Sequence, residues 1–371
     1  MGDRPRPDWT GRLRRLQADR DEAGVPALVV SSPPNITYLC GFTATAGLLV
    51  LSPGDERLLV DGRYVEAARR QVAAGLMASV EVEPVTGRYD QALSGVAGRL
   101  GAVRIGFEAC QVTVATLTAW RRATAGAEWV PTERLIERRR MLKDPVEIAV
   151  LRQACRGLAD VAGRLSEWVA EGRSEREVAR DLDTAIERVG LDGPAFPTIV
   201  SSGPNSALPH ARPTDRRLRA GDLVMLDFGG RLDGYCGDLT RMAAVGQVGA
   251  EARALFEAVR EAQAAAIAAV RPGQLASAVD TAAREVLERR GLGEAVRHAT
   301  GHGLGLELHE APRIARPDSH DAERLETTMV CTIEPGAYVD GLGGVRLEDD
   351  VLVTADGCEV LTAAPRDLVV V

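Results

Sequence analysis

Aromatic side chains are scarce in this 371-residue sequence: they make up 4% of it, although 45% of the residues are hydrophobic. Leucine, valine and alanine must therefore supply most of the core. Basic residues are not in excess either, because 45 lysines and arginines face 53 acidic residues and leave a formal net charge of −8. Binding to a phosphate backbone requires a basic face, so this charge argues against nucleic acid as a partner.

Long apolar runs are also missing. The most apolar helical stretch, residues 262–270, is too short to span a bilayer. The arginine- and proline-containing residues 1–7 are not followed by the apolar segment of a secretory signal. The six cysteines lie far apart without a CxxC pair, so we expect reduced, mostly buried thiols. We therefore expect a cytoplasmic protein that does not associate with membranes.

Two regions of the chain differ in their pattern of elements. Residues 1–140 alternate short apolar runs with segments of helical spacing, which is typical of an α/β domain. Three consecutive arginines, residues 138–140, then precede Pro145, which can open a helix. We interpret the arginines as a solvated helix end. They mark the expected boundary between a first domain, residues 1–140, and a second domain, residues 141–371.

The second region contains an internal repeat. Residues 172–190 align without a gap with residues 273–291, and both copies begin and end with glycine. Each copy is preceded by another long helical segment and followed by strand-like runs. The pattern predicts two related halves, each made of a helix pair and a sheet, with a cleft between them that suits a functional site.

Two aspartates lie on a predicted β-hairpin. An apolar run ends near Asp227, the pair Asp233-Gly234 is a hairpin turn signal, and the returning strand contains Asp238. A turn centred on that pair places Asp238 opposite Gly229, so the two aspartates become diagonal neighbours on one face, about 7–8 Å apart. Carboxylates this close repel unless a cation or a proton lies between them. A surface hairpin with two solvated aspartates would fit the same residues.

Three further acidic or imidazole side chains follow in suggestive positions. His302 lies among glycines, which allow close approach of backbones. Glu334 ends an apolar strand, and Glu348 lies in a strand of period two whose polar side also carries Arg346 and Asp350. Together with the two aspartates, these residues would balance the charge of two divalent ions. Oxygen-rich ligation with one nitrogen favours manganese, cobalt, iron or zinc.

At these residues the chain resembles the pita-bread metallopeptidases, specifically their aminopeptidase P and prolidase (Xaa-Pro dipeptidase) branch. The matching strings, in order, are SGPNSALPHA, LDFGGRLDGYCGDLTR, TGHGLGLELHE and IEPGAY…GVRLEDD, preceded by NITYLCGFTATAG and DGRYVEAA. The resemblance covers nearly the whole chain. It implies an α+β protein with a smaller, creatinase-like N-terminal α/β domain and a C-terminal pita-bread domain with an internal pseudo-twofold duplication.

The resemblance also implies a metal site. Two divalent ions, with manganese as the first expectation and cobalt, zinc or iron as alternatives, would be held by five residues: Asp227, Asp238, His302, Glu334 and Glu348.

Further residues match the family's active site. The resemblance makes His210 and His309 active-site histidines that do not ligate metal, and Tyr338 and Arg346 supporting residues near the ligands. Glu334 would also pass a proton from the attacking water towards the leaving nitrogen.

Three other residues lie near these motifs. Arg313 would neutralise a substrate carboxylate, although an exposed or structural arginine fits this position equally well. His298 and His320 have no motif support, and we interpret both as ordinary structural residues.

The implied activity is hydrolysis of the Xaa-Pro peptide bond, in dipeptides or at the N-terminus of longer peptides, by a hydroxide that bridges the two metals. His210 and His309 would stabilise the oxyanion. The substrate would be a small peptide with proline in second position, and the protein would be a homodimer whose N-terminal domain limits substrate length. The sequence leaves dipeptidase and aminopeptidase open.

Two other interpretations compete with this one. A hydrolase of the same fold could act on a non-peptide C–N bond, as creatinase and ectoine hydrolase do. A non-catalytic binding protein could also use the scaffold. The complete ligand set argues against metal-free creatinase chemistry and against a decayed site, while other amide substrates stay open.

Overall fold

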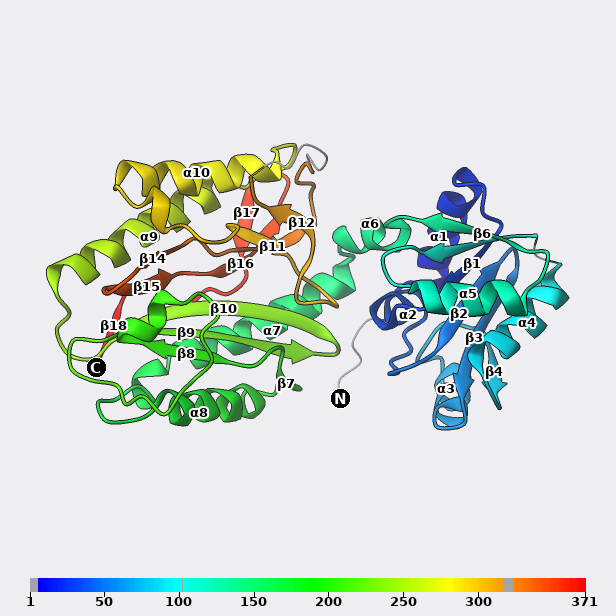
Figure 1. Ribbon diagram of the computed structural model, residues 1–371, viewed down its shortest axis with the longest axis horizontal. Coiled ribbons are helices and arrows are strands. Elements are labelled where there is room, and N and C mark those ends of the chain that lie inside the picture. The colour runs from blue at the N-terminus through cyan, green and yellow to red at the C-terminus, as the bar shows by residue number, and fades with distance from the viewer. Residues whose placement is uncertain (1–5, 102, 317–322) are drawn as a thin grey trace. The chain divides into compact units, whose positions relative to one another are not determined.

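The computed structural model describes residues 6–101, 103–316 and 323–371. The chain forms two compact units, Met1–Arg140 and Met141–Val371 (Figure 1). His320 lies outside the described residues. Within the described ranges, no helix is both long and apolar enough to cross a membrane. All six cysteines are free thiols, and four of them are buried.

The first unit is built around a six-stranded sheet with the order β4-β3-β2-β1-β5-β6. β2 pairs antiparallel with both of its neighbours, and the other pairs are parallel. The strands are β1 (Ala27–Val30), β2 (Leu48–Ser52), β3 (Asp55–Asp61), β4 (Glu81–Val85), β5 (Arg104–Glu108) and β6 (Glu128–Thr132). The helices are α1 (Trp9–Glu22), α2 (Pro33–Cys40), α3 (Val65–Ala73), α4 (Tyr89–Leu100), α5 (Val114–Ala123) and α6 (Leu135–Met141).

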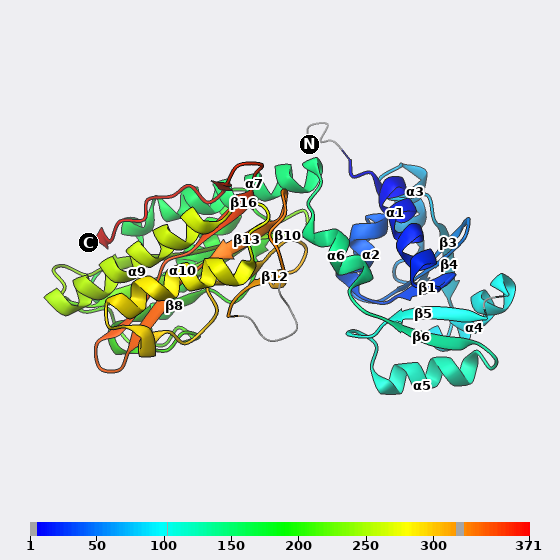
Figure 2. The same ribbon diagram turned by 90° about the horizontal axis from the view of Figure 1, so that it is seen from above.

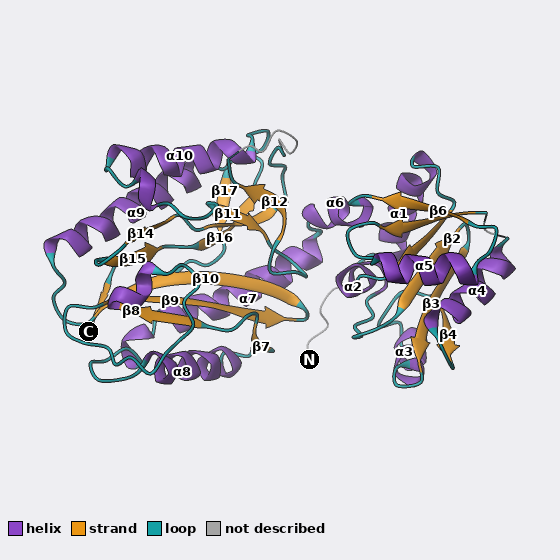
Figure 3. Ribbon diagram, viewed as in Figure 1, coloured by secondary structure: helices purple, strands orange, loops and turns teal. Residues whose placement is uncertain are grey.

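Helices α4 and α5 bury apolar side chains against one face of this sheet. Leu93 and Trp120 from the helices share a core with Phe107 and Trp129 from β5 and β6. The two tryptophan rings lie 5.0 Å apart between centroids. An α/β arrangement was expected for this region, and the structure confirms it (Figure 3).

The arginine cluster at the end of this unit differs from the prediction of a solvated helix end. Arg140 is only 2% exposed and donates a hydrogen bond to the side-chain oxygen of Asn35 at 2.8 Å. Arg139 pairs with Asp19. The prediction was wrong for Arg140 because a polar partner more than one hundred positions away allows its guanidinium to be buried.

The second unit contains two helix pairs and strands between them (Figures 1 and 2). The helices are α7 (Pro145–Ala162), α8 (Glu175–Arg188), α9 (Ala250–Ala269) and α10 (Ala276–Arg289), with short 3-10 turns η1 (Leu165–Glu167), η2 (Gly203–Ala207) and η3 (Gly293–Ala295). Helix α7 starts at Pro145, and a capping box joins its N-cap Asp144 to Glu147. Helix α8 starts with a capping box between Ser174 and Glu177.

Its strands form three sheets. The first has the order β18-β10-β9-β7, with β8 also paired to β9; the second has the order β12-β11-β13-β16-β17; the third is the pair β14-β15. The first contains β7 (Gly193–Pro194), β8 (Ile199–Ser202), β9 (Leu223–Leu232), β10 (Tyr235–Ala244) and β18 (Val369–Val370). The others contain β11 (Gly301–Gly303), β12 (Glu310–Ile314), β13 (Val330–Ile333), β14 (Gly336–Val339), β15 (Gly343–Arg346), β16 (Asp349–Val353) and β17 (Cys358–Val360).

The sequence repeat has a structural counterpart. Helices α8 and α10 each have 14 residues, and each follows a glycine with φ near +80°, Gly172 at +83° and Gly273 at +81°. The N–H groups of these glycines donate to the carbonyls of Leu218 and Leu325 at 2.9 and 2.7 Å. Because the same backbone bonds recur in both halves, the structure supports the predicted duplication.

Candidate metal centre

The hairpin of β9 and β10 has the predicted register. Asp238 lies opposite Gly229, and Asp227 lies opposite Thr240. The turn residues Asp233 and Gly234 have φ values of +50° and +85°, which a two-residue hairpin turn of type I′ requires. The turn chemistry therefore fixes the register and puts both aspartates on the same face of the sheet.

Glu334 and Glu348 lie at breaks between strands. Glu334 follows β13 as expected, but the prediction that Glu348 lies within a continuous strand was wrong. Strand β15 pairs with β14, whereas β16 pairs with β13, so the chain changes partner at residues 347–348. The facing break contains Pro335, which has no N–H to donate to a ladder. The N–H of Glu348 instead donates to the carbonyl of Thr240 at 3.2 Å.

His302 lies on β11 where backbones approach closely. A Cβ atom on Gly301 would lie 2.0 Å from the carbonyl oxygen of Thr332, and one on Gly303 would lie 2.1 Å from that of Ala311. Only glycine fits at both positions. The Nδ1 atom of His302 lies 3.1 Å from the carbonyl oxygen of Gly303. A carbonyl can only accept, so Nδ1 carries the proton and Nε2 keeps its lone pair.

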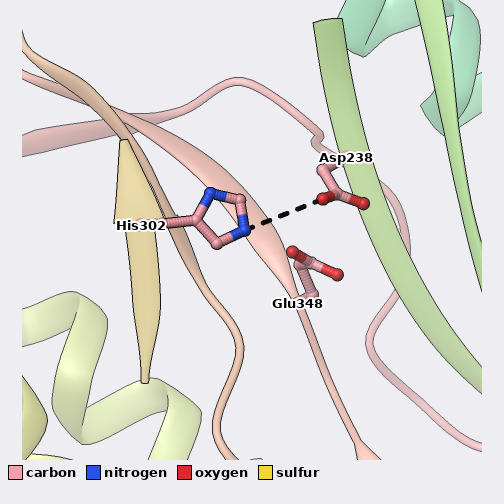
Figure 4. Close-up of side chains that lie close together, drawn as sticks. All are labelled: Asp238, His302 and Glu348. Carbon is pink, nitrogen blue, oxygen red and sulfur yellow. Dashed lines mark ion pairs between the residues drawn. The ribbon is translucent and has the colours of Figure 1, made fainter. Parts of the chain in front are cut away.

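Three of the predicted ligands converge closely. One ligand atom each from Asp238, His302 and Glu348 lies within 4.8 Å of the others (Figure 4). The Nε2 atom of His302 lies 4.0 Å from Oδ2 of Asp238 and 3.3 Å from Oε1 of Glu334. The structure thus brings four of the five predicted ligands together, from both halves of the unit.

Asp227, the fifth predicted ligand, shares the cavity but forms an ion pair with Arg346. Arg346 also donates through Nη1 to the hydroxyl of Tyr338 at 2.7 Å. Tyr338 and Arg346 were both expected near the ligands, and they are fully or nearly fully buried there.

His298 belongs to this network, although the sequence supports no role for it. Its Nε2 lies 2.7 Å from the hydroxyl of Tyr338, and its Nδ1 lies 2.8 Å from the carbonyl oxygen of Ala299. Nδ1 must donate to that carbonyl, so Nε2 accepts from the Tyr338 hydroxyl. Burial lowers the pKa of His298 to about 4. The only signal in the sequence was its position four residues before His302.

The acidic groups carry a large cost of burial. Burial raises the pKa of Asp238 and of Glu348 well above the ordinary range, and raises the pKa of Glu334 to about 7. Burial lowers the pKa of His302 to about 4, so its imidazole is neutral. The buried carboxyl groups of Asp238, Glu334 and Glu348 are stable in their charged form only beside a cation.

Two oxygen atoms indicate what the cluster can hold. Oδ1 of Asp238 and Oε1 of Glu348 are buried without a hydrogen-bond partner among the described residues. Buried carboxylate oxygens are normally satisfied, and a neutral imidazole with a free lone pair lies beside them. This donor set fits a divalent metal ion.

The cluster opens into a cavity of about 690 Å³. His210, His309 and Arg313 also line it, as do the apolar side chains of Phe196, Pro197, Ile199 and Leu308. The ring of His309 lies 4.1 Å from that of His302 between centroids. Arg313 lies opposite His302 in the register of β11 and β12. Every predicted site residue except Tyr338 therefore borders one cavity, and the buried Tyr338 is hydrogen-bonded to Arg346, which borders it.

Comparisons with known proteins agree with this arrangement. Residues 149–355 match metallopeptidase family M24, and residues 12–142 match the creatinase/prolidase N-terminal domain. The chain is 34% identical to the Xaa-Pro dipeptidase of Pyrococcus furiosus over 360 residues, covering 96% of this chain and 99% of that protein.

Solved structures show the same similarity. The Xaa-Pro dipeptidase from Bacillus anthracis superimposes with a TM-score of 0.92 at 34% identity, covering 98% of this chain and 100% of that one. The X-Pro aminopeptidase from Thermotoga maritima gives a TM-score of 0.85 at 31% identity, covering 95% and 100%. The predicted family and fold class are confirmed: the chain is a hydrolase that belongs to metallopeptidase family M24.

Proposed function

We propose that this protein hydrolyses the peptide bond that precedes proline in short peptides. The observation that carries the proposal is the convergence of buried acids and a neutral histidine on one cavity, where Oδ1 of Asp238 and Oε1 of Glu348 have no hydrogen-bond partner in the described part of the chain. Relatives that match nearly the whole chain are Xaa-Pro dipeptidases.

The proposed ligands of two divalent ions are Asp227, Asp238, His302, Glu334 and Glu348. Such ions supply an activated water and an electrophile for the substrate carbonyl. The negative charge of the buried acids favours cations of this kind. We propose that the second unit, residues 141–371, carries this chemistry.

Glu334 is the proposed proton carrier. Its side chain is 17% exposed, compared with 7% for that of Asp238, so it is the more accessible of the two from the cavity. Oε1 accepts a hydrogen bond from Thr332 at 3.3 Å, and Oε2 is the oxygen proposed to receive a proton from the attacking water. The leaving nitrogen of proline needs that proton when the bond breaks.

His210 and His309 are the proposed hydrogen-bond donors to the substrate carbonyl. Both are exposed to the cavity. Burial lowers the pKa of His309, so its imidazole is neutral near pH 7 and offers one N–H. A donor directed at the oxygen stabilises the charge that develops there.

Two features of the cavity suit a proline dipeptide. A tertiary amide has no N–H to donate, so its recognition depends on shape and apolar contact, which Phe196, Ile199 and Leu308 provide. Arg313 borders the same cavity and is the proposed partner of the substrate carboxylate.

The test compares Ala-Pro with Ala-Pro-Ala after the protein has been stripped of metal and reloaded with manganese, cobalt or zinc. We expect cleavage of both bonds to require metal and to be lost in Glu334→Gln. Preference for the dipeptide, reduced in Arg313→Met, would identify a dipeptidase, and preference for the tripeptide would identify an aminopeptidase. Metal binding without cleavage of either peptide would contradict the proposal and favour a non-peptide amide substrate.

Three further properties are proposed with this function. They are manganese as the native ion, a homodimeric assembly and a cytoplasmic location, the last in keeping with six free thiols. Metal analysis of protein purified without added metal, and sedimentation of that protein, would test the first two.

A further inference from the structure

Glu175 is a buried acid that lies outside the proposed metal centre. It occupies the first position of α8 and is 0% exposed. A buried carboxylate without good partners would be costly, so its partners indicate what it holds in place.

Those partners come from the two ends of one loop. Oε1 accepts from the backbone N–H and the hydroxyl of Ser202 at 2.8 and 2.7 Å. Oε2 accepts from the backbone N–H and the hydroxyl of Thr214 at 2.9 and 2.6 Å. The side-chain amide of Asn205, within the loop, lies 3.1 and 3.2 Å from the two oxygens. One carboxylate therefore ties residue 202 to residue 214.

The loop between these ends carries part of the cavity wall. Residues 203–213 include His210, which is one of the proposed donors to the substrate carbonyl, and His210 lines the cavity. Arg346 donates to the carbonyl of Pro209 at 3.1 Å, which fixes the middle of the loop. Glu175 fixes its base.

The duplication shows that this clamp is not part of the shared scaffold. In the second half, the first residue of the matching helix is Ala276, whose methyl side chain cannot accept a hydrogen bond. Its backbone N–H donates to the carbonyl of Glu323. The equivalent backbone bond also exists at Glu175, to the carbonyl of Arg216. The carboxylate is therefore an addition in the half that presents His210, beyond what the helix needs for its own packing.

We propose that Glu175 is a positioning residue that sets the place of His210 in the cavity by closing the loop of residues 203–213. The inference rests on the proposed function for the role of His210. Hydrogen bonds to a charged acceptor are stronger than neutral ones. An amide at this position would accept through a single oxygen, while its NH₂ group would face the N–H of Ser202 or of Thr214.

The experiment compares Glu175→Gln with Glu177→Gln, the same substitution two residues later. Glu177 accepts from the backbone N–H of Ser174 within its own capping box at 2.7 Å, so this control weakens the helix start rather than the bonds of Glu175 to Ser202 and Thr214. In Glu175→Gln, we expect amide hydrogen exchange in residues 203–213 to become about tenfold faster. We expect little change there in Glu177→Gln, and none in β9 and β10 in either variant.

Activity gives the second readout. Glu175→Gln should lower kcat/KM for the proline peptide by roughly 10–100-fold with metal content unchanged. If Glu175 acts through His210, then Glu175→Gln should cost little more when it is added to His210→Ala. Independent, multiplicative losses would overturn the proposal, and so would unchanged exchange in residues 203–213.

Two other outcomes are also informative. If Glu175→Gln fails to fold, Thr214→Val, which removes one hydroxyl donor, must speed exchange in the same loop or the proposal is wrong. If the wild-type protein cleaves no proline peptide, the proposed function fails, whereas the exchange comparison still decides whether Glu175 holds the loop.

Discussion

The two halves of the second unit share a helix pair and differ in how they present their acids. In the first half, Asp227 and Asp238 lie within a regular hairpin whose ten pairs have no shift in register. In the second half, Glu334 and Glu348 lie where strands end and exchange partners. A regular hairpin can place two carboxylates on one face. In the second half, Glu334 and Glu348 instead lie in the breaks between strands, where the strand pairing is interrupted.

This difference assigns distinct tasks to related parts of the chain. The hairpin supplies a pair of acids, β11 supplies a histidine, and the breaks between the other strands supply two further acids that complete the cluster. Neither half holds the whole set, so equivalent damage to either half should have equivalent consequences at the site.

The largest effect on activity is expected from two single substitutions, each of which removes one acid from a different half. Asp238→Asn and Glu348→Gln should each lower kcat/KM by about 1,000-fold, because a metal site supplies several kcal/mol of transition-state stabilisation. Bound metal, measured by mass spectrometry of the purified variants, should fall in both. Full activity in one variant would show that the half concerned is dispensable, contrary to a shared site.

The ionisation of Glu334 should change the stability of the metal-free protein with pH. Burial raises the pKa of Glu334 to about 7, above its unfolded value near 4.5. The stability that this group contributes is then fully present below pH 4.5 and is lost as the pH rises through 7, a change on the order of 3 kcal/mol. Glu334→Gln has no such proton to lose.

The two metal-free proteins should therefore diverge as the pH rises. Their melting temperatures should be similar at pH 5, and Glu334→Gln should be the more stable protein at pH 8. Reloading the wild-type protein with metal should restore the stability that it loses at pH 8. A constant difference across this range would contradict the assigned cause.

The smallest effect concerns the scaffold that the two halves share. Gly172→Ala and Gly273→Ala both place a side chain at φ near +80°, and neither new Cβ atom would lie within 4 Å of an atom of the described residues. Each should cost about 1 kcal/mol through backbone strain alone. Equal decreases in melting temperature are expected. A clear inequality would mean that the two helix starts are not equivalent.

The sequence predicts best where local chemistry determines geometry. The pair Asp233-Gly234 fixes a turn, the turn fixes a register, and the register places Asp227 and Asp238 correctly. The repeat is visible because its glycines and helix lengths are local features. Close approach around His302 follows in the same way from its neighbouring glycines.

What the sequence could not predict depends on partners distant in the chain. Glu348 leaves its strand because β15 and β16 pair with different neighbours. Arg140 is buried because its guanidinium donates a hydrogen bond to Asn35. His298 lines the cavity and is hydrogen-bonded there to Tyr338, 40 positions later. In the sequence, Glu175 looks like an ordinary acid in the first turn of a helix. Its bonds to Ser202 and Thr214 exist only in the folded chain.

Hydrogen bonds join the two halves, so the halves are not independent repeats. The N–H of Cys236 donates to the carbonyl of Gly305 at 2.8 Å, and that of Glu348 donates to Thr240. The N–H of Asp238 donates to the carboxylate of Asp350 at 2.9 Å. A fragment containing one half would expose these groups together with its unmatched acids. Fragment complementation, in which separately produced halves are mixed, should therefore yield a folded protein only when both are present, because each half supplies hydrogen-bond partners for buried groups of the other.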